Sequence, residues 1–338
     1  MQPKMLFVHS GNETFVKLDR EILSEFAVVN DLFAQRKFPA GFGQYWLGVR
    51  EADIIFCWFA SWNSFWTLLF AKLFKKPSIL VIGGYDIANL PESDYGLQRG
   101  GIGKWVSHSA MKLATELITN SYYSQGEVEQ NARITSKNVK VIYHGVPDLF
   151  GSMPSMLKER IALTVGKVDW PNLKRKGLEP FVRSAMYLPD IQFILVGDYA
   201  DNSIEYLRSI ASENVIFTGR ASGEELINYY QRASVYVQAS LHEGFGMSCA
   251  EAMLAGCIPV TTRAGSLPEV VGDCGFYCNS PEPSDVARTI VAALNTSQSV
   301  RQKARERILS YFPMEKRKKE LGETILSISP NGLHTNDI

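Results

Sequence analysis

The sequence predicts an α/β protein made of two doubly wound domains. Short runs of β-branched and aromatic residues alternate with helical stretches from one end of the chain to the other. Several of these runs are apolar throughout, as is typical of parallel strands that are covered on both faces of a sheet. The chain of 338 residues suits two domains of about 150 residues each. Strand–helix alternation along such a chain favours two open parallel sheets.

Six strands are expected in each half of the chain. In the first half they are Met5–His9, Phe26–Val29, Asp53–Trp58, Ser78–Ile82, Glu116–Thr119 and Val139–Tyr143. In the second half they are Ile161–Val165, Gln192–Val196, Val215–Thr218, Val235–Gln238, Ile258–Thr261 and Gly275–Tyr277. Helices are expected between them, such as Leu178–Leu188 and Ser222–Ala233. The second of these begins with a capping box formed by Ser222 and Glu225.

The boundary between the domains is expected at Asp148–Glu159, a segment with glycine, proline and serine between the two strand–helix series. The predicted domains are residues 1–150 and 151–310. A C-terminal helix over residues 311–328 is expected to pack back on the first domain. Residues 329–338 are expected to form a frayed tail.

The aromatic-rich segment Trp58–Lys76 supports two interpretations. It ends in a basic cluster, as does a helix that lies in a membrane interface. It also lies between two expected strands, where a buried crossover helix is required, and we favour this interpretation. Contact with the inner face of a membrane stays open as the alternative. No run in the sequence reaches the roughly 18 apolar residues of a membrane-spanning helix.

Composition narrows the function classes. Lys and Arg number 35, as do Asp and Glu, so no overall positive charge favours binding to nucleic acid. The five cysteines are sparse and lie mostly in apolar surroundings, which indicates buried free thiols in a reducing compartment. The N-terminal apolar run is too short for a signal peptide. We therefore expect a cytoplasmic protein.

The most informative stretch runs from Gln238 to Val260. Its two glutamates, Glu243 and Glu251, are eight residues apart, but three other glutamate pairs in the chain share that spacing. Their context is what distinguishes them. Glu243 follows an expected strand and precedes a Gly-Phe-Gly loop, and a helix over Gly246–Ala255 follows. This is a strand, a glycine loop and a helix N-terminus at the carboxyl edge of a parallel sheet.

Such an edge suits a phosphorylated ligand. Unpaired N–H groups of Gly246, Met247 and Ser248 could bind phosphate oxygens with the help of the helix dipole. Glu251 would reach vicinal hydroxyls such as those of a ribose, and Glu243 would accept hydrogen bonds from sugar hydroxyls. The residues alone also allow a plainer interpretation, in which both glutamates are solvated and the glycines only form a turn.

The stretch from His242 to Val260 resembles the donor-site motif of the retaining glycosyltransferases of family 4. Further blocks resemble the same family in the same order. They are Tyr143–Phe150, Ile161–Val168, Lys176-Gly177, Asn214–Ser240 and Gly265–Glu269. The resemblance is close over about residues 139–295 and extends to the first 138 residues only in general layout. It implies the GT-B fold, in which two Rossmann-like domains face each other across a cleft.

The resemblance also implies roles for individual residues. Glu251 would bind the nucleotide ribose, Glu243 the donor sugar and Lys176 the diphosphate. The implied catalytic residues are Lys176, Lys167 and Glu243. The implied donor-binding residues are Gly219, Arg220, Gly244, Phe245, Gly246, Met247, Ser248 and Glu251.

One position departs from the family pattern. The family commonly has arginine where Lys167 stands, with the lysine five or six residues later, whereas Lys176 follows Lys167 after nine. The loop is therefore longer, and Lys174 or Arg175 could take the role of that arginine. Lysine keeps the positive charge but lacks the two-pronged hydrogen bonding of arginine.

The implied reaction is the transfer of a hexose-type sugar from a nucleoside-diphosphate sugar, with retention of configuration and front-face attack. The acceptor would be a glycan, a lipid or a small molecule. Breaking the anomeric bond leaves negative charge on the diphosphate, which fixed lysines and helix N–H groups can stabilise. Neither a metal nor a cofactor is expected, and the chain contains no Asp-x-Asp tripeptide.

Candidate acceptor-side residues follow the first and fourth expected strands. They are His9, Gly11, Tyr85 and Asp86. Gly11 would allow close approach of a ligand, and Asp86 would take the acceptor proton or orient the acceptor hydroxyl. The family often has a histidine near the fourth strand, where this chain has Gly-Gly-Tyr-Asp, so the resemblance implies no acceptor-side role.

Four other functions compete with this one. A nicotinamide-dependent dehydrogenase needs a Gly-x-Gly-x-x-Gly turn after a strand, and neither half has one. A sugar-nucleotide epimerase or a phosphorylase of related architecture is a further alternative. A non-catalytic nucleotide-sugar-binding or partner subunit could keep the same donor motif, and turnover would distinguish it.

Overall fold

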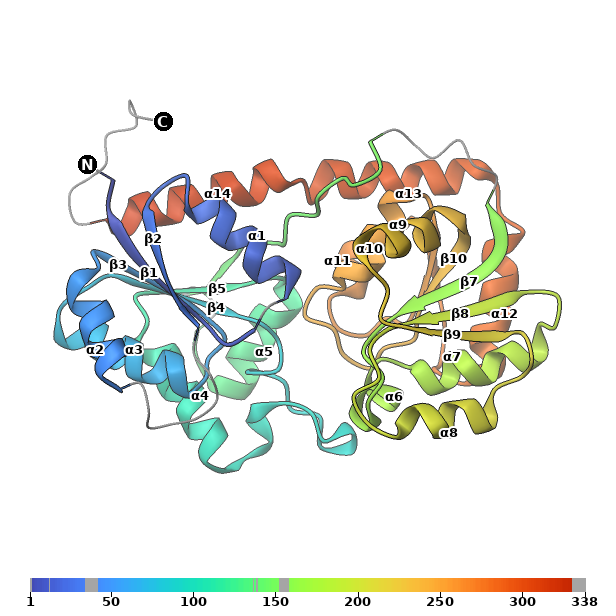
Figure 1. The fold of residues 1–338 in the computed structure, drawn as a ribbon, viewed down its shortest axis with the longest axis horizontal. Helices are drawn as coiled ribbons and strands as arrows, with labels where there is room; N and C mark the ends of the chain where they lie inside the picture. Colours follow the sequence, from blue (N-terminus) through green and yellow to red (C-terminus); the bar gives the residue numbers. More distant parts are fainter. Residues whose placement is uncertain are drawn as a thin grey trace. The chain divides into compact units, whose positions relative to one another are not determined.

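The computed structural model describes residues 2–11, 13–33, 42–135, 137, 139–151 and 158–329. The chain divides into two compact units (Figure 1). Unit 1 comprises Met1–His144 with Glu315–Ile338, and unit 2 comprises Gly145–Met314. The expected boundary at residue 150 lies six residues after the observed one, and the chain returns to unit 1 at residue 315 instead of 311. The predicted tail at 329–338 lies, apart from Ser329, outside the described residues.

Unit 1 contains a parallel sheet of six strands in the order β2-β1-β3-β4-β5-β6. The strands are β1 (Lys4–His9), β2 (Val28–Phe33), β3 (Ile54–Trp58), β4 (Ser78–Ile82), β5 (Glu116–Thr119) and β6 (Val139–Val141). The helices are α1 (Thr14–Leu23), α2 (Phe42–Glu51), α3 (Trp62–Leu73), α4 (Gly101–Leu113), α5 (Tyr122–Ala132) and α14 (Met314–Ile328). Every residue of β3 and β4 is buried, as expected for central strands covered on both faces.

Unit 2 repeats this plan with strand order β12-β11-β10-β7-β8-β9. The strands are β7 (Glu159–Val165), β8 (Gln192–Val196), β9 (Val215–Gly219), β10 (Ala233–Gln238), β11 (Ile258–Thr261) and β12 (Phe276–Tyr277). The helices are α6 (Trp170–Arg175), α7 (Leu178–Ser184), α8 (Ser203–Ile210), α9 (Gly223–Arg232), α10 (Met247–Leu254), α11 (Leu267–Val271), α12 (Pro283–Leu294) and α13 (Gln298–Tyr311). The predicted class of two doubly wound parallel sheets is confirmed.

Two predicted elements differ from the observed ones for local reasons. The strand expected at Phe26–Val29 begins two residues later, because the amides of Phe26 and Ala27 still bond to the last turn of α1. The helix expected over Leu178–Leu188 ends at Ser184 and continues as a 3₁₀ turn. Proline follows Leu188 in the sequence and disfavours helical backbone at the residue before it.

The aromatic-rich segment forms α3, which connects β3 to β4. Its inner residues, including Leu68 and Ala71, join the core beneath the sheet. Within the part of the chain that the structure describes, no helix is both long and apolar enough to cross a membrane. The segment is therefore the crossover helix that the strand–helix alternation predicts.

Helix α14 is attached to unit 1 by a buried ion pair. The guanidinium of Arg317 donates from Nε to Oδ1 of Asp19 at 2.5 Å and from Nη2 to Oδ2 at 2.6 Å. Its Nη1 donates to the carbonyl oxygen of Tyr143 at 2.8 Å, and the indole of Trp58 donates to Asp19 at 3.1 Å. Both charged side chains are buried, at 2% and 0% exposure. The last helix of the chain thereby becomes part of the first unit.

We predict that Asp19→Asn destabilises unit 1 by about 3 kcal/mol or more, because it leaves the Arg317 guanidinium buried without its carboxylate. Urea unfolding of the full chain, followed by tryptophan fluorescence, measures the effect, since Trp58 contacts Asp19. The matched control is Glu25→Gln, which breaks the more exposed pair of α14 with Lys318 and should cost less than about 1 kcal/mol. Equal losses in the two variants would contradict this account.

Candidate functional site

The candidate site lies at the carboxyl edge of the unit 2 sheet. Strand β10 is buried along its whole length and lies between β7 and β11, so the loops that follow these three strands emerge at the same edge. The loop after β10 carries Glu243 and leads into α10. The loop after β7 leads into α6 and to Lys176. Residues far apart in the sequence thus meet at one end of the sheet.

The Glu243 loop is held from the side by the loop after β11. Gly265 has a φ of +62°, and a Cβ at this position would lie 2.5 Å from the backbone nitrogen of Glu243. Ser266 donates from its amide and its hydroxyl to the carbonyl oxygen of Glu243, at 3.0 and 3.1 Å. Only glycine permits this approach, so the backbone of Glu243 has little freedom.

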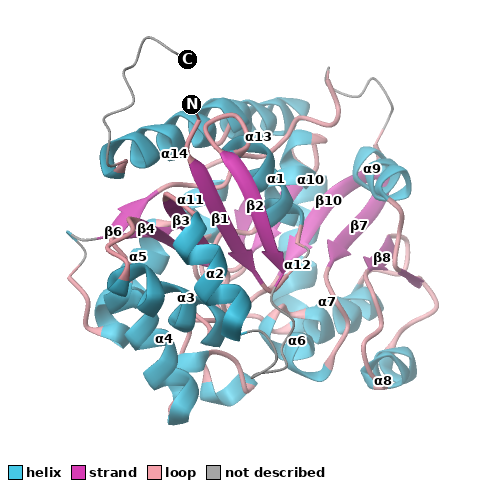
Figure 2. Cartoon of the chain, turned by 60° about the vertical axis from the view of Figure 1, so that its left-hand side comes forward, coloured by secondary structure: helices cyan, strands magenta, loops and turns pink. Residues whose placement is uncertain are grey.

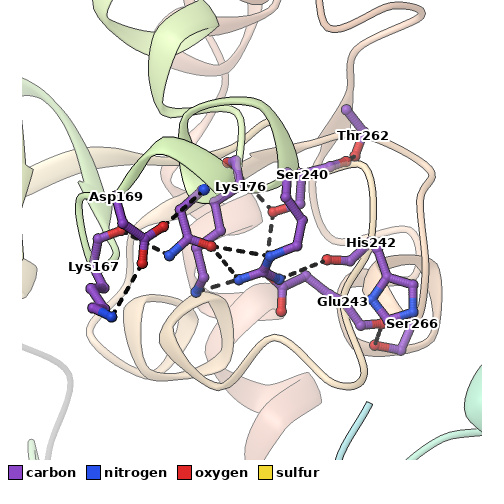
Figure 3. Close-up of polar contacts among 10 residues, drawn as sticks. Lys167, Asp169, Lys176, Ser240, His242, Glu243, Thr262 and Ser266 are labelled. Atoms are coloured by element: carbon purple, nitrogen blue, oxygen red, sulfur yellow. Dashed lines mark hydrogen bonds and ion pairs between the residues drawn. The ribbon is translucent and has the colours of Figure 1, made fainter. Parts of the chain in front are cut away.

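The carboxylate of Glu243 is surrounded by positive charge (Figure 3). Its Oε1 lies 3.8 Å from Nζ of Lys176 and 4.0 Å from Nη1 of Arg175, and it accepts a hydrogen bond from Ser240 Oγ at 3.1 Å. Its side chain is only 12% exposed. Burial alone would raise the pKa of Glu243, but Lys176 and Arg175 outweigh it and hold the pKa below its ordinary value. Glu243 is therefore ionised at neutral pH.

The two cations are placed by a tight junction between α6 and α7. Gly177 adopts a φ of +69°, and a Cβ there would lie 2.2 Å from the carbonyl oxygen of Ala239. The amide of Leu241 donates to the carbonyl oxygen of Arg175 at 2.7 Å. This hydrogen bond joins the end of α6 to the loop after β10. The close approach of Gly177 to Ala239 explains why glycine follows Lys176.

Arg175 is the cation that the sequence identified only as an alternative. It is buried, and its Nε and Nη2 donate to Oδ1 of Asn172 at 3.1 and 2.6 Å. Lys167 is 58% exposed and pairs instead with Asp169, Nζ to Oδ2, at 3.2 Å. Lys174 lies on the exposed side of α6. Of the three candidates for the family's arginine, the structure brings Arg175 next to Glu243.

The loop continues into α10 through a second constrained glycine. Gly246 has a φ of +96° and is the N-cap of α10, so the helix begins at Met247, one residue later than the sequence predicts. The ring of Phe245 is buried against Phe312, with ring centroids 5.3 Å apart. Phe245 can therefore offer a ligand only its backbone. Met247 and Ser248 lie in the first helical turn, where N–H groups point along the axis out of the helix.

Glu251 lies one turn further along α10 in a different environment. Its Oε2 accepts a hydrogen bond from the hydroxyl of Tyr230 at 2.9 Å, and Tyr230 is itself buried. Burial raises the pKa of Glu251 to about 7, although the hydrogen bond from Tyr230 lowers it. Near neutral pH this carboxyl group therefore exists in both protonation states.

Gly219 is the last residue of the edge strand β9, and Arg220 follows it. Gly219 has a φ of +71°, and its carbonyl oxygen accepts the amide of Gly197 at 2.9 Å. The side chain of Arg220 is exposed. These two expected donor-binding residues thus lie at the same carboxyl edge as β10, two strands away from β7.

Sequence reasoning missed Ser240 and Tyr230, which hold the two glutamate side chains. Neither carries a recognisable signal, because a serine or tyrosine that bonds to a carboxylate has no characteristic spacing from it. Ser266, which fixes the Glu243 backbone, lies in a block that resembles the family, although no role was assigned to it.

The acceptor-side candidates lie in unit 1, where His9 is the last residue of β1 and Gly11 lies in the loop after it. His9 bonds from Nδ1 to the carbonyl oxygen of Gly11 at 2.7 Å, and its Nε2 lies 3.7 Å from Asp31. Tyr85 is 44% exposed and packs against Tyr95.

Asp86 occupies the interior of the loop after β4. It is 2% exposed, and its carboxylate accepts backbone N–H groups of Ala60 at 2.8 Å, Gly83 at 3.1 Å and Gly84 at 2.8 Å. Burial raises the pKa of Asp86, and these N–H donors oppose the rise. This position favours a role in fixing the loops after β3 and β4 over the expected contact with an acceptor hydroxyl.

We predict that the raised pKa of Glu251 makes folding stability depend on pH. Because the pKa is about 7 in the folded state against 4.5 ordinarily, the folded protein binds this proton more tightly than the unfolded chain. Stability is therefore lost as pH rises from about 4.5 to about 7, by up to about 3 kcal/mol. In Glu251→Gln this loss should disappear. Urea unfolding of both proteins between about pH 5 and pH 8 tests it, and parallel profiles would refute it.

The part of the chain that contains this site is similar to known proteins. Residues 159–296 match the family described as Glycosyl transferases group 1. An MMP alpha-(1->4)-mannosyltransferase from Mycolicibacterium hassiacum is 29% identical over 178 residues, which are 51% of this chain and 42% of the relative. The sulfoquinovosyl transferase SQD2 of Arabidopsis thaliana is 28% identical over 45% of this chain and 32% of the relative. The chain thus spans less than half the length of these curated relatives.

Solved structures extend the similarity to both units. Anabaena Alr3699/HepE, solved with UDP and glucose, matches with a TM-score of 0.76 at 19% identity over 96% of this chain and 100% of that one. Sucrose-phosphate synthase of Thermosynechococcus elongatus matches with a TM-score of 0.75 at 15% identity over 96% and 98%. At sequence identities of 19% and 15%, the similarity to these structures shows the fold alone, which is GT-B. Residues 159–296 thus match the group 1 glycosyltransferases in sequence, and both units share the GT-B fold.

Proposed function

We propose that the chain transfers a sugar from a nucleoside-diphosphate sugar to an acceptor with retention of configuration. The observation that carries the proposal is the cluster of Lys176, Arg175 and Glu243 directly before the N-terminus of α10. Two cations and a helix N-terminus at one sheet edge suit a diphosphate. The relatives named as mannosyltransferases support a hexosyl donor.

Lys176 and Arg175 are proposed to act differently. The guanidinium of Arg175 is buried and already donates to Asn172 and His242, so it serves as a positioning residue that keeps Glu243 ionised and in place. The side chain of Lys176 is 24% exposed and lies 3.8 Å from Glu243, so its ammonium can turn toward a ligand. As the anomeric bond breaks, negative charge grows on the leaving diphosphate, and Lys176 with the amides of α10 stabilises it.

The two glutamates are proposed to bind hydroxyl groups. Glu243 is ionised and buried, so it can accept hydrogen bonds from the donor sugar. Glu251, one turn into α10, can accept them from the vicinal hydroxyls of the ribose. We assign no covalent nucleophile, and we propose that the step needs neither a metal nor a cofactor, because Lys176 and the helix amides supply the positive charge.

The acceptor is proposed to be a glycan, a lipid or a small molecule, and the protein to act in the cytoplasm. The alternative is a non-catalytic nucleotide-sugar-binding or partner subunit, which would retain the donor site. It is distinguished by turnover: stabilisation by a donor without sugar transfer or slow donor hydrolysis would favour it.

We predict that one class of nucleotide raises the melting temperature of the protein. A panel of UDP, GDP, ADP and their sugars, each well above typical dissociation constants, should show a shift with one base only, since ligands that bind the folded state stabilise it. The responding base identifies the donor. If none of these ligands shifts the transition, the donor site is refuted.

We predict a split between two single variants at this site. Glu251→Ala should weaken nucleotide binding, because it removes the ribose contact, whereas Lys176→Ala should mainly lower the turnover number by roughly 100-fold, because it acts on the leaving group. Calorimetric titration with the responding nucleotide measures the first effect, and release of nucleoside diphosphate measures the second. The exposed Lys303→Ala serves as the control. Full activity in both site variants would exclude the assigned roles.

A further inference from the structure

Unit 1 has an apolar surface along α3. Helices α2, α3 and α4 lie next to one another on one face of its sheet (Figure 2). Leu68 and Ala71 of α3 belong to the core, whereas Trp62, Trp66, Leu69 and Leu73 are spaced so that they share the outer side of the helix. Trp66 and Leu69 also pack in part against that core. Trp62 and Leu73 are exposed, and the two between them are half-buried. A helix of a protein in water normally carries polar residues on this side.

The neighbouring helices extend this surface. On α4, Trp105 is 56% exposed and packs against Phe65, with ring centroids 5.4 Å apart. On α2, Trp46 is 40% exposed and packs against Phe74 at 4.6 Å. We call Trp46, Trp62, Trp66, Leu69, Leu73 and Trp105 the α3 surface. Contiguous apolar surface of this kind marks an interaction site, whereas isolated exposed apolar residues need no explanation.

The charged residues of α3 and α4 are all lysines, whereas α2 ends with Arg50 and Glu51, whose charges cancel. No acidic residue occurs between Asp53 and Asp86, a stretch that contains all of α3, and none occurs in α4. Lysines are present instead, and Lys72 and Lys75 at the end of α3 and Lys112 at the end of α4 are exposed. The whole chain has a net charge of zero, so this region is positive relative to the rest of the protein.

We propose that the α3 surface binds a membrane whose headgroups are anionic, with α3 lying in the plane of the interface. Tryptophan rings favour the level of the headgroups, since they combine an apolar body with a polar N–H. Lysine side chains lay their aliphatic stems on apolar surface and direct their ammonium groups toward lipid phosphates. A helix of 12 residues suits this position, and it is too short to cross the bilayer.

Charge argues against a second copy of the chain as the occupant. In a two-fold symmetric dimer the same surface meets itself. The lysines beside the α3 surface of one copy would then face the same lysines of the other copy. They would repel each other, because α3 and α4 contain no acidic residue to compensate their charge. An anionic bilayer supplies the opposite charge and takes up the apolar side chains at the same time.

The test is co-sedimentation of the full chain with vesicles of phosphatidylcholine alone or mixed with phosphatidylglycerol. We expect binding to the mixed vesicles that weakens as salt is added, because the lysine contribution is screened. The Trp62→Gln/Trp105→Gln variant should lose most of this binding. Its control is Tyr187→Gln, which replaces an exposed aromatic residue of unit 2 and should bind as the unaltered protein does.

A second variant avoids any effect on packing. Lys72→Gln/Lys75→Gln alters only exposed residues and should weaken partitioning into the mixed vesicles roughly 30-fold, at about fivefold for each lysine near the headgroups. Lys303→Gln/Lys319→Gln removes the same charge elsewhere and should have little effect.

Three results would overturn the proposal. They are no binding at low salt, equal binding to neutral vesicles, or a concentration-dependent dimer that the tryptophan variant abolishes. The proposal does not depend on the proposed transfer reaction. Nucleotide-induced shifts of the melting temperature should be the same in these variants as in the unaltered protein.

Discussion

A buried carboxylate stays ionised only when positive charge or hydrogen-bond donors compensate for the water it has lost. At the carboxyl edge of the unit 2 sheet this condition is met at Glu243, where Lys176, Arg175 and Ser240 surround one oxygen. The three come from the end of β10 and the junction of α6 with α7. The carboxylate therefore stays charged only if the segment after β10 and the α6–α7 junction keep their positions relative to each other. Gly177 and Gly265 allow the close backbone contacts with Ala239 and Glu243 that fix these positions.

The second glutamate of the site shows what happens without such compensation. Glu251 lies on the helix that follows Glu243, yet its named partner is a neutral hydroxyl, that of Tyr230. Its pKa is raised to about 7, while that of Glu243 is lowered. Two identical side chains eight residues apart thus acquire different charge states from their surroundings. A group near its titration point can accept or donate a hydrogen bond, which suits a contact with a pair of hydroxyls.

The two units carry their chemistry in different ways. In unit 2 the charged groups are gathered at the sheet edge, where loops meet. In unit 1 the carboxylate of Asp86 already accepts hydrogen bonds from backbone N–H groups. In this unit exposed tryptophan and leucine side chains lie on the outer side of α3. If this side meets a membrane, the acceptor that suits it best is a lipid or a glycan attached to one. This connects the two proposals while leaving each open to its own test.

The sequence by itself determined the order and type of the elements, because burial on both faces of a parallel sheet demands continuous apolar runs. Strands β4, β5, β8 and β11 have the bounds that such runs predict. It also predicted a role for Glu243, because a glycine loop before a helix can be recognised from neighbouring residues, whereas Lys176 was implied by the family resemblance. Edge strand β2 begins later than predicted, because Phe26 and Ala27 still bond to the last turn of α1.

Only the tertiary structure decided which distant side chains meet. Arg175 rather than Lys167 or Lys174 reaches Glu243, because the side of α6 that packs inward is set by the contacts of Gly177 and Leu241. Asp19 and Arg317 pair across 298 positions of the chain. Local sequence predicts a helix or strand from the burial that its residues require. It does not indicate which other helix, strand or loop supplies the side chain that pairs with a given charged residue. That choice depends on how loops and helices close around each sheet.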